Sequence, residues 1–336
     1  MTLLLALWLF WNQAEALSQQ ALELAQQGKA AEAERLWKQA LQQEPGLFSA
    51  AFNLGLFYRS QGRHQDAERS LTAAVKAQPK DFNARYLLGA TLVQLGRSED
   101  ALRHWRVASQ LQPANWRLLQ VMAVEYAKGR YFRDAAETAE RALTLKTDDP
   151  NIYLAAIKAR QDSGDHPAAL KLAARMIERF PTSPRANFEY AYELHRAARG
   201  TEALPYLNKA MSADQTYEEP FFFYAEILMQ EGRMEEAIAP LRRAIQLRRD
   251  YMAAWVALGR ALMSLNGLDE AKAELLRALE INPKHPQPHL LLSQLYFRMG
   301  LEDDAAREKE LSLKLRREDP LAMEAAQGRV FTSPPQ

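Results

Sequence analysis

Alanine recurs along this chain at a fixed spacing of 34 residues. In most units a packing residue such as Trp37, Leu71 or Leu275 stands four residues after the alanine, and a second small residue stands seven after it. Positions i, i+4 and i+7 share one face of an α-helix, where small residues let a neighbouring helix approach closely. The spacing therefore predicts one packed helix in each of nine units, marked by Ala33, Ala67, Ala101, Ala135, Ala169, Ala203, Ala237, Ala271 and Ala305.

A turn separates this helix from another apolar-periodic helix upstream of it. In six units a glycine stands five residues before the alanine, whereas Gly129, Gly200 and Gly267 are displaced by one or two residues. A proline twelve residues after the alanine ends the helix in five units. No unit shows the alternation of a strand, and a single helix hairpin cannot bury its apolar face alone. The pattern predicts helix, turn, helix in each unit, stacked into an all-α solenoid.

These residues resemble the tetratricopeptide repeat (TPR) family. Its signature, W-x2-L-G-x2-Y followed by spaced A, F, A and P, is matched best by Trp255-x2-Leu258-Gly259-x2-Leu262 with Ala271, Leu275, Ala278 and Pro283. The resemblance covers residues 14–319 and implies a right-handed superhelical solenoid of about nine 34-residue helix-turn-helix repeats. Repeats four to seven depart from it where glycine is usual, which affects the expected helix spacing there, at Ala123, Ile157, Ala191 and Ala225.

The two ends of the chain differ from the repeats. The apolar run Leu3 to Trp11 and the A-x-A sequence that ends at Ala16 fit a signal peptide over residues 1–16, with a mature chain that begins at Leu17. However, no Lys or Arg precedes the run, so it equally fits the apolar start of the first helix, or a start codon placed too late. At the other end, we expect Lys309 and Ser312 to turn the last helix polar, and residues 320–336 to form a mobile tail.

Composition and charge exclude several function classes. The chain has 48% hydrophobic residues, so it should fold. Its formal charge of +1 provides no field for nucleic acid. The absence of cysteine excludes disulfides, thiol nucleophiles and thiolate metal sites. The longest apolar run has nine residues, too few for an integral membrane span.

Candidate catalytic and metal-binding groups have structural explanations. An acidic residue precedes the repeated alanine in eight units, where it would face the positive end of the second helix's dipole. Only His285 and His289 are spaced like metal ligands, and prolines between them indicate solvated histidines in a turn. No phosphate-binding loop, dinucleotide fingerprint or nucleophile elbow is present. We therefore predict no enzyme activity, no catalytic residue, no metal site and no cofactor.

The TPR resemblance implies that the first helix of each repeat lines a concave groove. The groove positions are aromatic with an excess of cations, a composition typical of protein-recognition hot spots, although intramolecular packing explains each ring equally well. We expect Phe188, Tyr192, Arg196 and Phe222 to lie close together as the main patch. The candidate groove residues are Phe52, Arg59, Tyr86, Lys158, Phe188, Tyr192, Arg196, Phe222, Arg260 and Arg298.

The function that this pattern favours is a protein-interaction scaffold that binds an extended peptide or a partner helix. The alternative is an accessory module of a cell-envelope, polysaccharide-export or secretion machine. The carboxylate clamp of chaperone-binding family members is not expected, because only Asn53 has a plausible counterpart. The expected partner is a protein or peptide, not nucleic acid. The location would be periplasmic or secreted if residues 1–16 are a signal peptide, and cytoplasmic otherwise.

Overall fold

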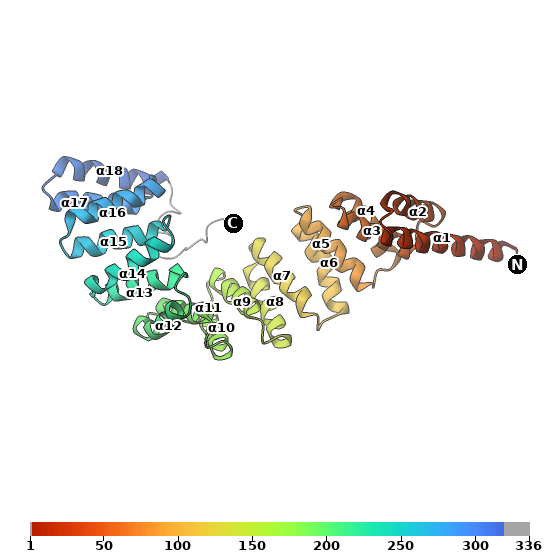
Figure 1. The fold of residues 1–336 in the computed structure, drawn as a ribbon, viewed down its shortest axis with the longest axis horizontal. Helices are drawn as coiled ribbons and strands as arrows, with labels where there is room; N and C mark the ends of the chain where they lie inside the picture. Colours follow the sequence, from red (N-terminus) through yellow and green to blue (C-terminus); the bar gives the residue numbers. More distant parts are fainter. Residues whose placement is uncertain (1, 319–336) are drawn as a thin grey trace. The chain divides into compact units, whose positions relative to one another are not determined.

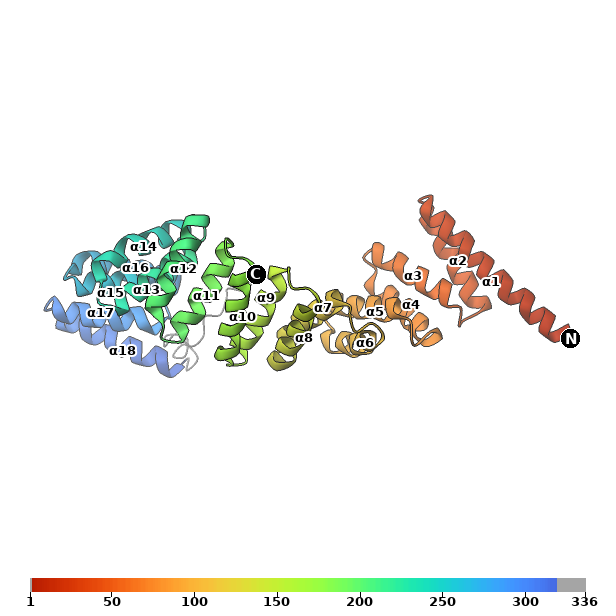
Figure 2. The ribbon, with the colours of Figure 1, turned by 90° about the horizontal axis from the view of Figure 1, so that it is seen from below.

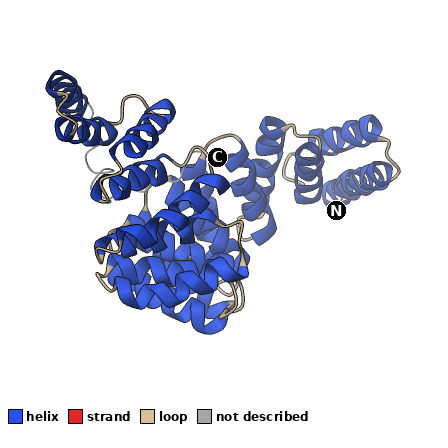
Figure 3. Cartoon of the chain, turned by 60° about the vertical axis from the view of Figure 1, so that its left-hand side comes forward, coloured by secondary structure: helices blue, strands red, loops and turns tan. Residues whose placement is uncertain are grey.

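A computed structural model describes residues 2–318, with side chains from residue 13 onward. These residues form eighteen α-helices and no strand, which confirms the all-α prediction (Figure 3). The expected tail, residues 320–336, lies outside the described residues. The first ten helices are α1 (Thr2–Gln26), α2 (Ala30–Gln43), α3 (Phe48–Ser60), α4 (His64–Ala77), α5 (Phe82–Gln94), α6 (Ser98–Leu111), α7 (Trp116–Lys128), α8 (Phe132–Leu145), α9 (Pro150–Asp162) and α10 (His166–Arg179). The remaining eight are α11 (Pro184–Arg196), α12 (Gly200–Ala213), α13 (Glu218–Gln230), α14 (Met234–Leu247), α15 (Met252–Ser264), α16 (Leu268–Ile281), α17 (Pro286–Arg298) and α18 (Glu302–Glu318).

The chain divides into two compact units, residues 1–172 and 173–336, with the boundary inside α10. Within each unit a helix packs against the one that follows it, as in α3 with α4 or α15 with α16 (Figures 1 and 2). The first helices of successive repeats also contact one another, as α11 does α13, α13 does α15 and α15 does α17. Each unit is therefore a stack of helix hairpins in which a repeat contacts its neighbours.

The 34-residue period of the sequence is the period of the helices. Each first helix from α3 onward begins 34 residues after the previous one, at residues 48, 82, 116 and so on to 286. All nine repeated alanines are buried, eight of them at 1% exposure or less. The small residues therefore stand where two helices of a hairpin meet, as predicted.

The turn position in each repeat keeps its register even where glycine does not. The residue five before the alanine has a positive φ in all nine repeats. Six of these residues are glycines, but Arg130, Ala198 and Asn266 adopt φ values of 62°, 58° and 63°. The displaced glycines Gly129 and Gly267 do not take over this conformation. Three repeats therefore hold a side chain in the left-handed region, which favours glycine.

The last repeat is less polar than the sequence suggests. Lys309 is exposed as expected, but Ser312 is buried and donates a hydrogen bond to the Pro286 carbonyl at 2.8 Å. In addition, α18 exposes Leu311 and Leu313. The expectation that Ser312 adds to a polar outer face is therefore wrong. Its side chain is buried, because a carbonyl of the preceding helix satisfies its hydroxyl.

The first helix runs through the expected cleavage site. Helix α1 covers Thr2–Gln26, and Ala14 is fully buried in a core with Trp37, Leu36 and Leu54. Glu15 accepts a hydrogen bond from Ser49 at 2.9 Å. Residues on both sides of the expected cut thus belong to the first repeat in this structure, and cleavage after Ala16 stays a prediction.

Candidate interaction surface

Six aromatic rings gather on the first helices of unit 2. They belong to α11, to α13 and to the residues just before α13 and α15, and we call them the aromatic cluster: Phe188, Tyr192, Tyr217, Phe222, Phe223 and Tyr251. Phe223 is at its centre, with its ring centroid 5.6 Å from Phe188, 5.1 Å from Tyr192 and 5.2 Å from Phe222. Edge-on and tilted contacts at these distances stabilise aromatic pairs by more than the burial of their apolar area alone.

The expected patch is brought together, but by a residue that the sequence analysis did not select. Phe188 and Tyr192 lie 6.1 Å apart between ring centroids, and Arg196 donates to the Tyr192 hydroxyl at 3.2 Å. Phe222 joins them through Phe223, one position further along α13. Phe223 could have been found from the sequence, because four aromatic residues in succession, 221–224, must turn at least one ring toward the preceding helix.

The rings of the cluster differ in what they offer to a ligand. Phe188 is 6% exposed, Phe222 3% and Phe223 6%, so these three rings pack against one another. Tyr192 and Arg196 are half-buried and stay accessible on the same face. The buried rings therefore hold Tyr192 and Arg196 in place, and the accessible edge of the cluster is polar and cationic.

Charged residues frame this edge with opposite signs. Arg185 donates to the Tyr217 hydroxyl at 2.9 Å and pairs with Glu189 at 2.7 Å. Arg248 stacks over Tyr251, 3.6 Å from its centroid, and pairs with Glu218 at 2.9 Å. Burial raises the pKa of the Tyr217 hydroxyl well above its usual range, against the opposing effect of the Arg185 charge.

Burial also raises the pKa of one carboxyl on α13. Glu219 occupies the second position of this helix, close to Glu218, whose charge raises the pKa further. The site therefore contains a carboxyl with a raised pKa near Arg185 and Arg248, whose charges oppose this shift.

The predicted cations of the groove mostly link one repeat to the next. Arg260 of α15 pairs with Glu226 of α13 at 2.6 Å. Arg298 of α17 donates to the Met263 carbonyl at 2.7 Å and to Asn266 at 3.0 Å. Charge-assisted bonds of this kind are short and directional, so these side chains are held by the neighbouring repeat.

The two predicted cations of unit 1 differ in their partners. Arg59 donates to the Leu87 carbonyl at 2.8 Å and to Thr91 at 2.9 Å, and burial lowers the pKa of its guanidinium. Lys158 is exposed and pairs with Asp162 on its own helix at 2.9 Å. Arg59 therefore links two repeats, whereas Lys158 faces solvent and is paired within its own helix.

Two predicted groove rings of unit 1 stack on aromatic neighbours. The Phe52 ring lies 5.4 Å from Phe48, and the Tyr86 ring lies 5.9 Å from Phe82 and 6.4 Å from Trp105. Both Phe52 and Tyr86 are half-buried. Their role in binding stays a prediction, as does that of the other groove candidates.

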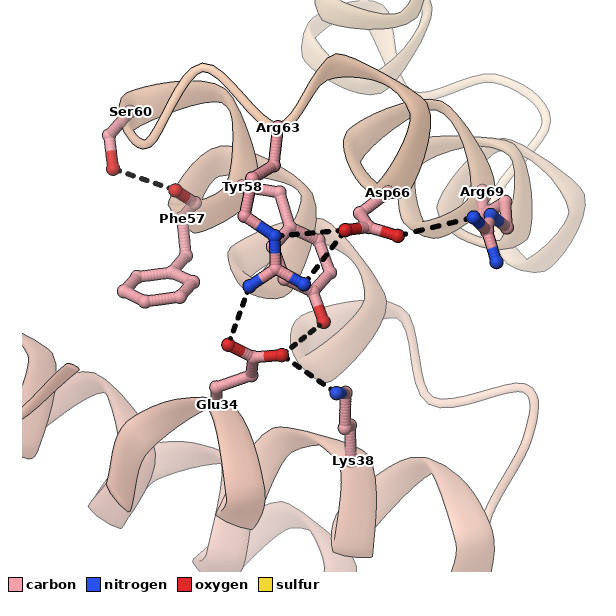
Figure 4. A network of polar contacts seen from close by, with 8 residues as sticks. All are labelled: Glu34, Lys38, Phe57, Tyr58, Ser60, Arg63, Asp66 and Arg69. Atoms are coloured by element: carbon pink, nitrogen blue, oxygen red, sulfur yellow. Dashed lines mark hydrogen bonds and ion pairs between the residues drawn. The ribbon is translucent and has the colours of Figure 1, made fainter. Parts of the chain in front are cut away.

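A polar network that the sequence analysis did not foresee joins the first two repeats (Figure 4). Glu34 of α2 accepts from Lys38 at 2.7 Å, from the Tyr58 hydroxyl at 2.9 Å and from Arg63 at 2.8 Å. Arg63 also pairs with Asp66, which belongs to the predicted row of carboxylates. The next repeat repeats the arrangement, since Arg97 pairs with both Glu68 and Asp100 at 2.6 Å. The carboxylates at the start of the second helices thus act in ion pairs as well as at the helix dipole.

The two paired histidines are not solvated turn residues. His289 is buried, with Nδ1 2.6 Å from Glu308 and Nε2 2.9 Å from the Pro283 carbonyl. His285 precedes α17 and accepts from the Gln287 amide at 3.3 Å, and burial lowers the pKa of its ring. The expectation of solvation is wrong because the two helices of the last repeat close over His289. Within residues 2–318 no three His, Asp or Glu side chains converge as a metal site would require.

Over the part of the chain that the structure describes, no helix combines the length and the apolarity needed to cross a bilayer.

Comparison with known families identifies the repeats. Two family models, both described as tetratricopeptide repeat, match most of the chain, over residues 18–70, 58–115, 154–218 and 230–295. No curated protein matches the chain.

Solved structures share the fold at low sequence identity. A chain of the APC/C hetero-tetramer Cut9–Hcn1 is 13% identical with a TM-score of 0.55, over 94% of this chain and 76% of that one. Yeast Tom70 is 16% identical with a TM-score of 0.46, over 92% and 77%. YrrB, described as a TPR protein with an unusual peptide-binding site, is 19% identical with a TM-score of 0.46, over 57% and 99%. At 13% identity, the match to the chain of the Cut9–Hcn1 hetero-tetramer concerns the fold alone.

Proposed function

Because the chain belongs to the tetratricopeptide repeat family, whose members are protein-interaction scaffolds and typically not catalysts, we propose that it binds an extended peptide or a partner helix on the first helices of unit 2. The observation that carries this proposal is the aromatic cluster with Tyr192 and Arg196 at its accessible edge. Tyrosine and arginine are enriched among residues that dominate binding energy, because they combine apolar area with directional hydrogen bonding.

The cluster is pre-organised for a ligand. The Tyr192 ring is fixed between Phe188 and Phe223, and Arg196 is held one helical turn away by its bond to the Tyr192 hydroxyl. A side chain that is already immobile loses little conformational entropy when a partner docks against it. The pair Arg260–Glu226 continues the same face onto α15, so the face extends over three first helices.

The test uses peptides selected on the intact protein from a random display library, so that no partner is assumed. We expect the selected peptides to bind Tyr192→Ala and Arg196→Ala about tenfold or more weakly, since a central anchor contributes about 2 kcal/mol. Tyr206→Ala is the matched control, because this half-buried tyrosine lies on α12, a second helix. Unchanged binding to both variants with normal helicity would place recognition elsewhere.

Phe222→Ala answers a different question from Tyr192→Ala. Phe222 is buried, so its truncation leaves a cavity and should lower the melting temperature as well as binding. A loss of binding by Phe222→Ala alone would therefore not identify a contact residue, whereas a loss by Tyr192→Ala at an unchanged melting temperature would.

The alternative function is an accessory module of a cell-envelope, polysaccharide-export or secretion machine. The apolar run Leu3 to Trp11 with an A-x-A sequence after it supports this alternative, because both fit a secretory signal. N-terminal sequencing of the native protein distinguishes the two: a chain that begins at Leu17 supports a periplasmic or secreted role, and an intact Met1 or Thr2 contradicts it.

A further inference from the structure

A hollow of about 720 Å³ lies in unit 2 beside the start of α15. Its lining residues come from the end of α14, the residues that lead into α15, the start of α15 and the end of α16. No residue of the aromatic cluster lines it. Its size is within the range of pockets that bind ligands, and it involves three helices of two adjacent repeats.

The floor of the hollow is apolar. It is made by Trp255, which is half-buried, together with Ile245 and the partly exposed Ile281. The indole nitrogen of Trp255 donates to the Arg249 carbonyl at 2.8 Å. Because this bond satisfies the one polar atom of the indole, the ring offers the hollow only apolar surface.

The rim of the hollow carries one uncompensated positive charge. Arg277 donates to both carboxylate oxygens of Glu280, at 2.9 and 2.7 Å, so these two charges cancel. The exposed Arg249 has no side-chain hydrogen bond or ion pair with any residue that the structure describes. Its neighbour Asp250 does not line the hollow. An apolar floor with one free guanidinium beside it complements an apolar group that is followed by a carboxylate.

We propose that this hollow is a second protein-binding site and that its ligand is an acidic peptide segment with a large aliphatic or aromatic side chain. The apolar side chain packs on Trp255, and a neighbouring carboxylate accepts from Arg249. The rim residues Gln246, Arg249, Arg277 and Glu280 are all exposed, so the hollow admits a side chain that stays attached to a passing chain. The hollow shares no lining residue with the aromatic cluster, so a scaffold with both sites holds two segments at once.

The test uses a capped peptide of alternating glutamate and leucine, and the same peptide with lysine in place of glutamate. The probe of location is the indole N–H signal of Trp255 in the nitrogen-15 spectrum of the full chain, assigned by its loss in Trp255→Phe. We expect the acidic peptide to shift this signal, the basic peptide not to, and Arg249→Ala to weaken binding about tenfold. Arg141→Ala is the matched control, an exposed arginine on α8 without a side-chain partner among the described residues.

Three results would overturn the proposal: no binding of the acidic peptide, binding that leaves the Trp255 signal in place, or equal binding to Arg249→Ala and Arg141→Ala. Arg249 is exposed and unpaired, so loss of folding does not confuse the variant. Binding of the acidic peptide to Tyr192→Ala separates the two sites. Normal binding there shows that the hollow acts whether or not the first-helix face binds peptides, and a tenfold loss assigns the peptide to that face and removes the case for the hollow.

Discussion

At the scale of single residues, the turn between the two helices of a repeat is fixed by backbone geometry and not by the glycine that usually provides it. Nine repeats place a positive φ at the same position, and three of them do so with a side chain. An L-residue costs about 1–2 kcal/mol in this region, whereas glycine enters it without a steric cost. The packing of the two helices imposes the turn, and Arg130 and Ala198 bear the strain.

Replacing Ala198 by glycine should therefore stabilise the protein. We expect Ala198→Gly to raise the free energy of unfolding by about 0.5–1 kcal/mol, the relief of strain less the entropy that glycine gains in the unfolded chain. Urea unfolding followed by circular dichroism measures the change. Gly232→Ala is the control. Gly232 has φ 80° at the same position of the next repeat, so this variant should be less stable than the unmodified protein. A lower midpoint for Ala198→Gly would show that the turn is not strained.

A second glycine has a packing role that its backbone does not reveal. A Cβ atom placed on Gly89 would lie 2.6 Å from Cδ1 of Trp105, a ring that is buried and donates to the Tyr86 carbonyl. The ring cannot move away without losing that bond and its place in the core. Gly89 thus sets how closely α5 and α6 approach.

We expect Gly89→Ala to destabilise unit 1 by about 1–3 kcal/mol, the usual cost of overpacking a core. The change should appear as a lower melting temperature and as altered near-ultraviolet circular dichroism from Trp105. Gly46→Ala provides the comparison, since a Cβ on Gly46 meets nothing within 4 Å. Equal stability of the two variants would contradict a packing role for Gly89.

The sequence predicts the helices of this molecule more completely than the partners of its long side chains. The alanine period determines where helices meet, because burial of a small residue at i and i+7 is a property of the helix itself. The partner of Arg59 is 28 residues away in the next repeat, and no local pattern identifies it. The expectations that His289 is solvated and that Ser312 is on a polar face are wrong for the same reason. The partners of these side chains, Glu308 and the Pro286 carbonyl, come from the other helix of the hairpin.

At the scale of helices, polar side chains add specific links between repeats to the apolar packing. The network around Glu34 joins α2 to Tyr58 of α3 and to Arg63, which lies between α3 and α4 (Figure 4). The hydrogen bond from Lys38, with those from Arg63 and Tyr58, lowers the pKa of the Glu34 carboxyl from 4.5 to about 2, against the opposing effect of burial. The carboxylate form is thus favoured in the folded chain.

A lowered pKa in the folded state gives stability that is present above the unfolded value of about 4.5 and is lost as the pH falls toward 2. Glu34→Gln should therefore unfold at a lower temperature than the unmodified chain at pH 7, and the difference should shrink between pH 5 and pH 3. Glu32→Gln, on the exposed side of the same helix, is the control. A difference for Glu34→Gln that does not change with pH would show that packing of the side chain, and not its charge, matters.

At the scale of the whole molecule, stability is expected to be local, because within each unit the helices of a described repeat pack against those of the next repeat. Helix α17 packs against α15, α16 and α18, and its Arg298 donates to the Met263 carbonyl of α15. Removing the last repeat uncovers the apolar faces of α15 and α16, whereas α3 to α9 belong to the other unit. In such an array, stability is approximately a sum of repeat terms and nearest-neighbour terms.

Deletion of residues 286–336 should therefore lower amide protection in α15 and α16 by about tenfold or more and leave α3 to α9 unchanged. Native-state hydrogen exchange with peptide resolution measures both regions in one experiment. The variant Arg298→Met separates the two contributions, because it removes the hydrogen bond to Met263 and keeps the apolar contacts, and it should lower protection at the end of α15 only. If protection instead falls evenly along the truncated chain, the repeats unfold as one cooperative body and the nearest-neighbour account of this solenoid is wrong.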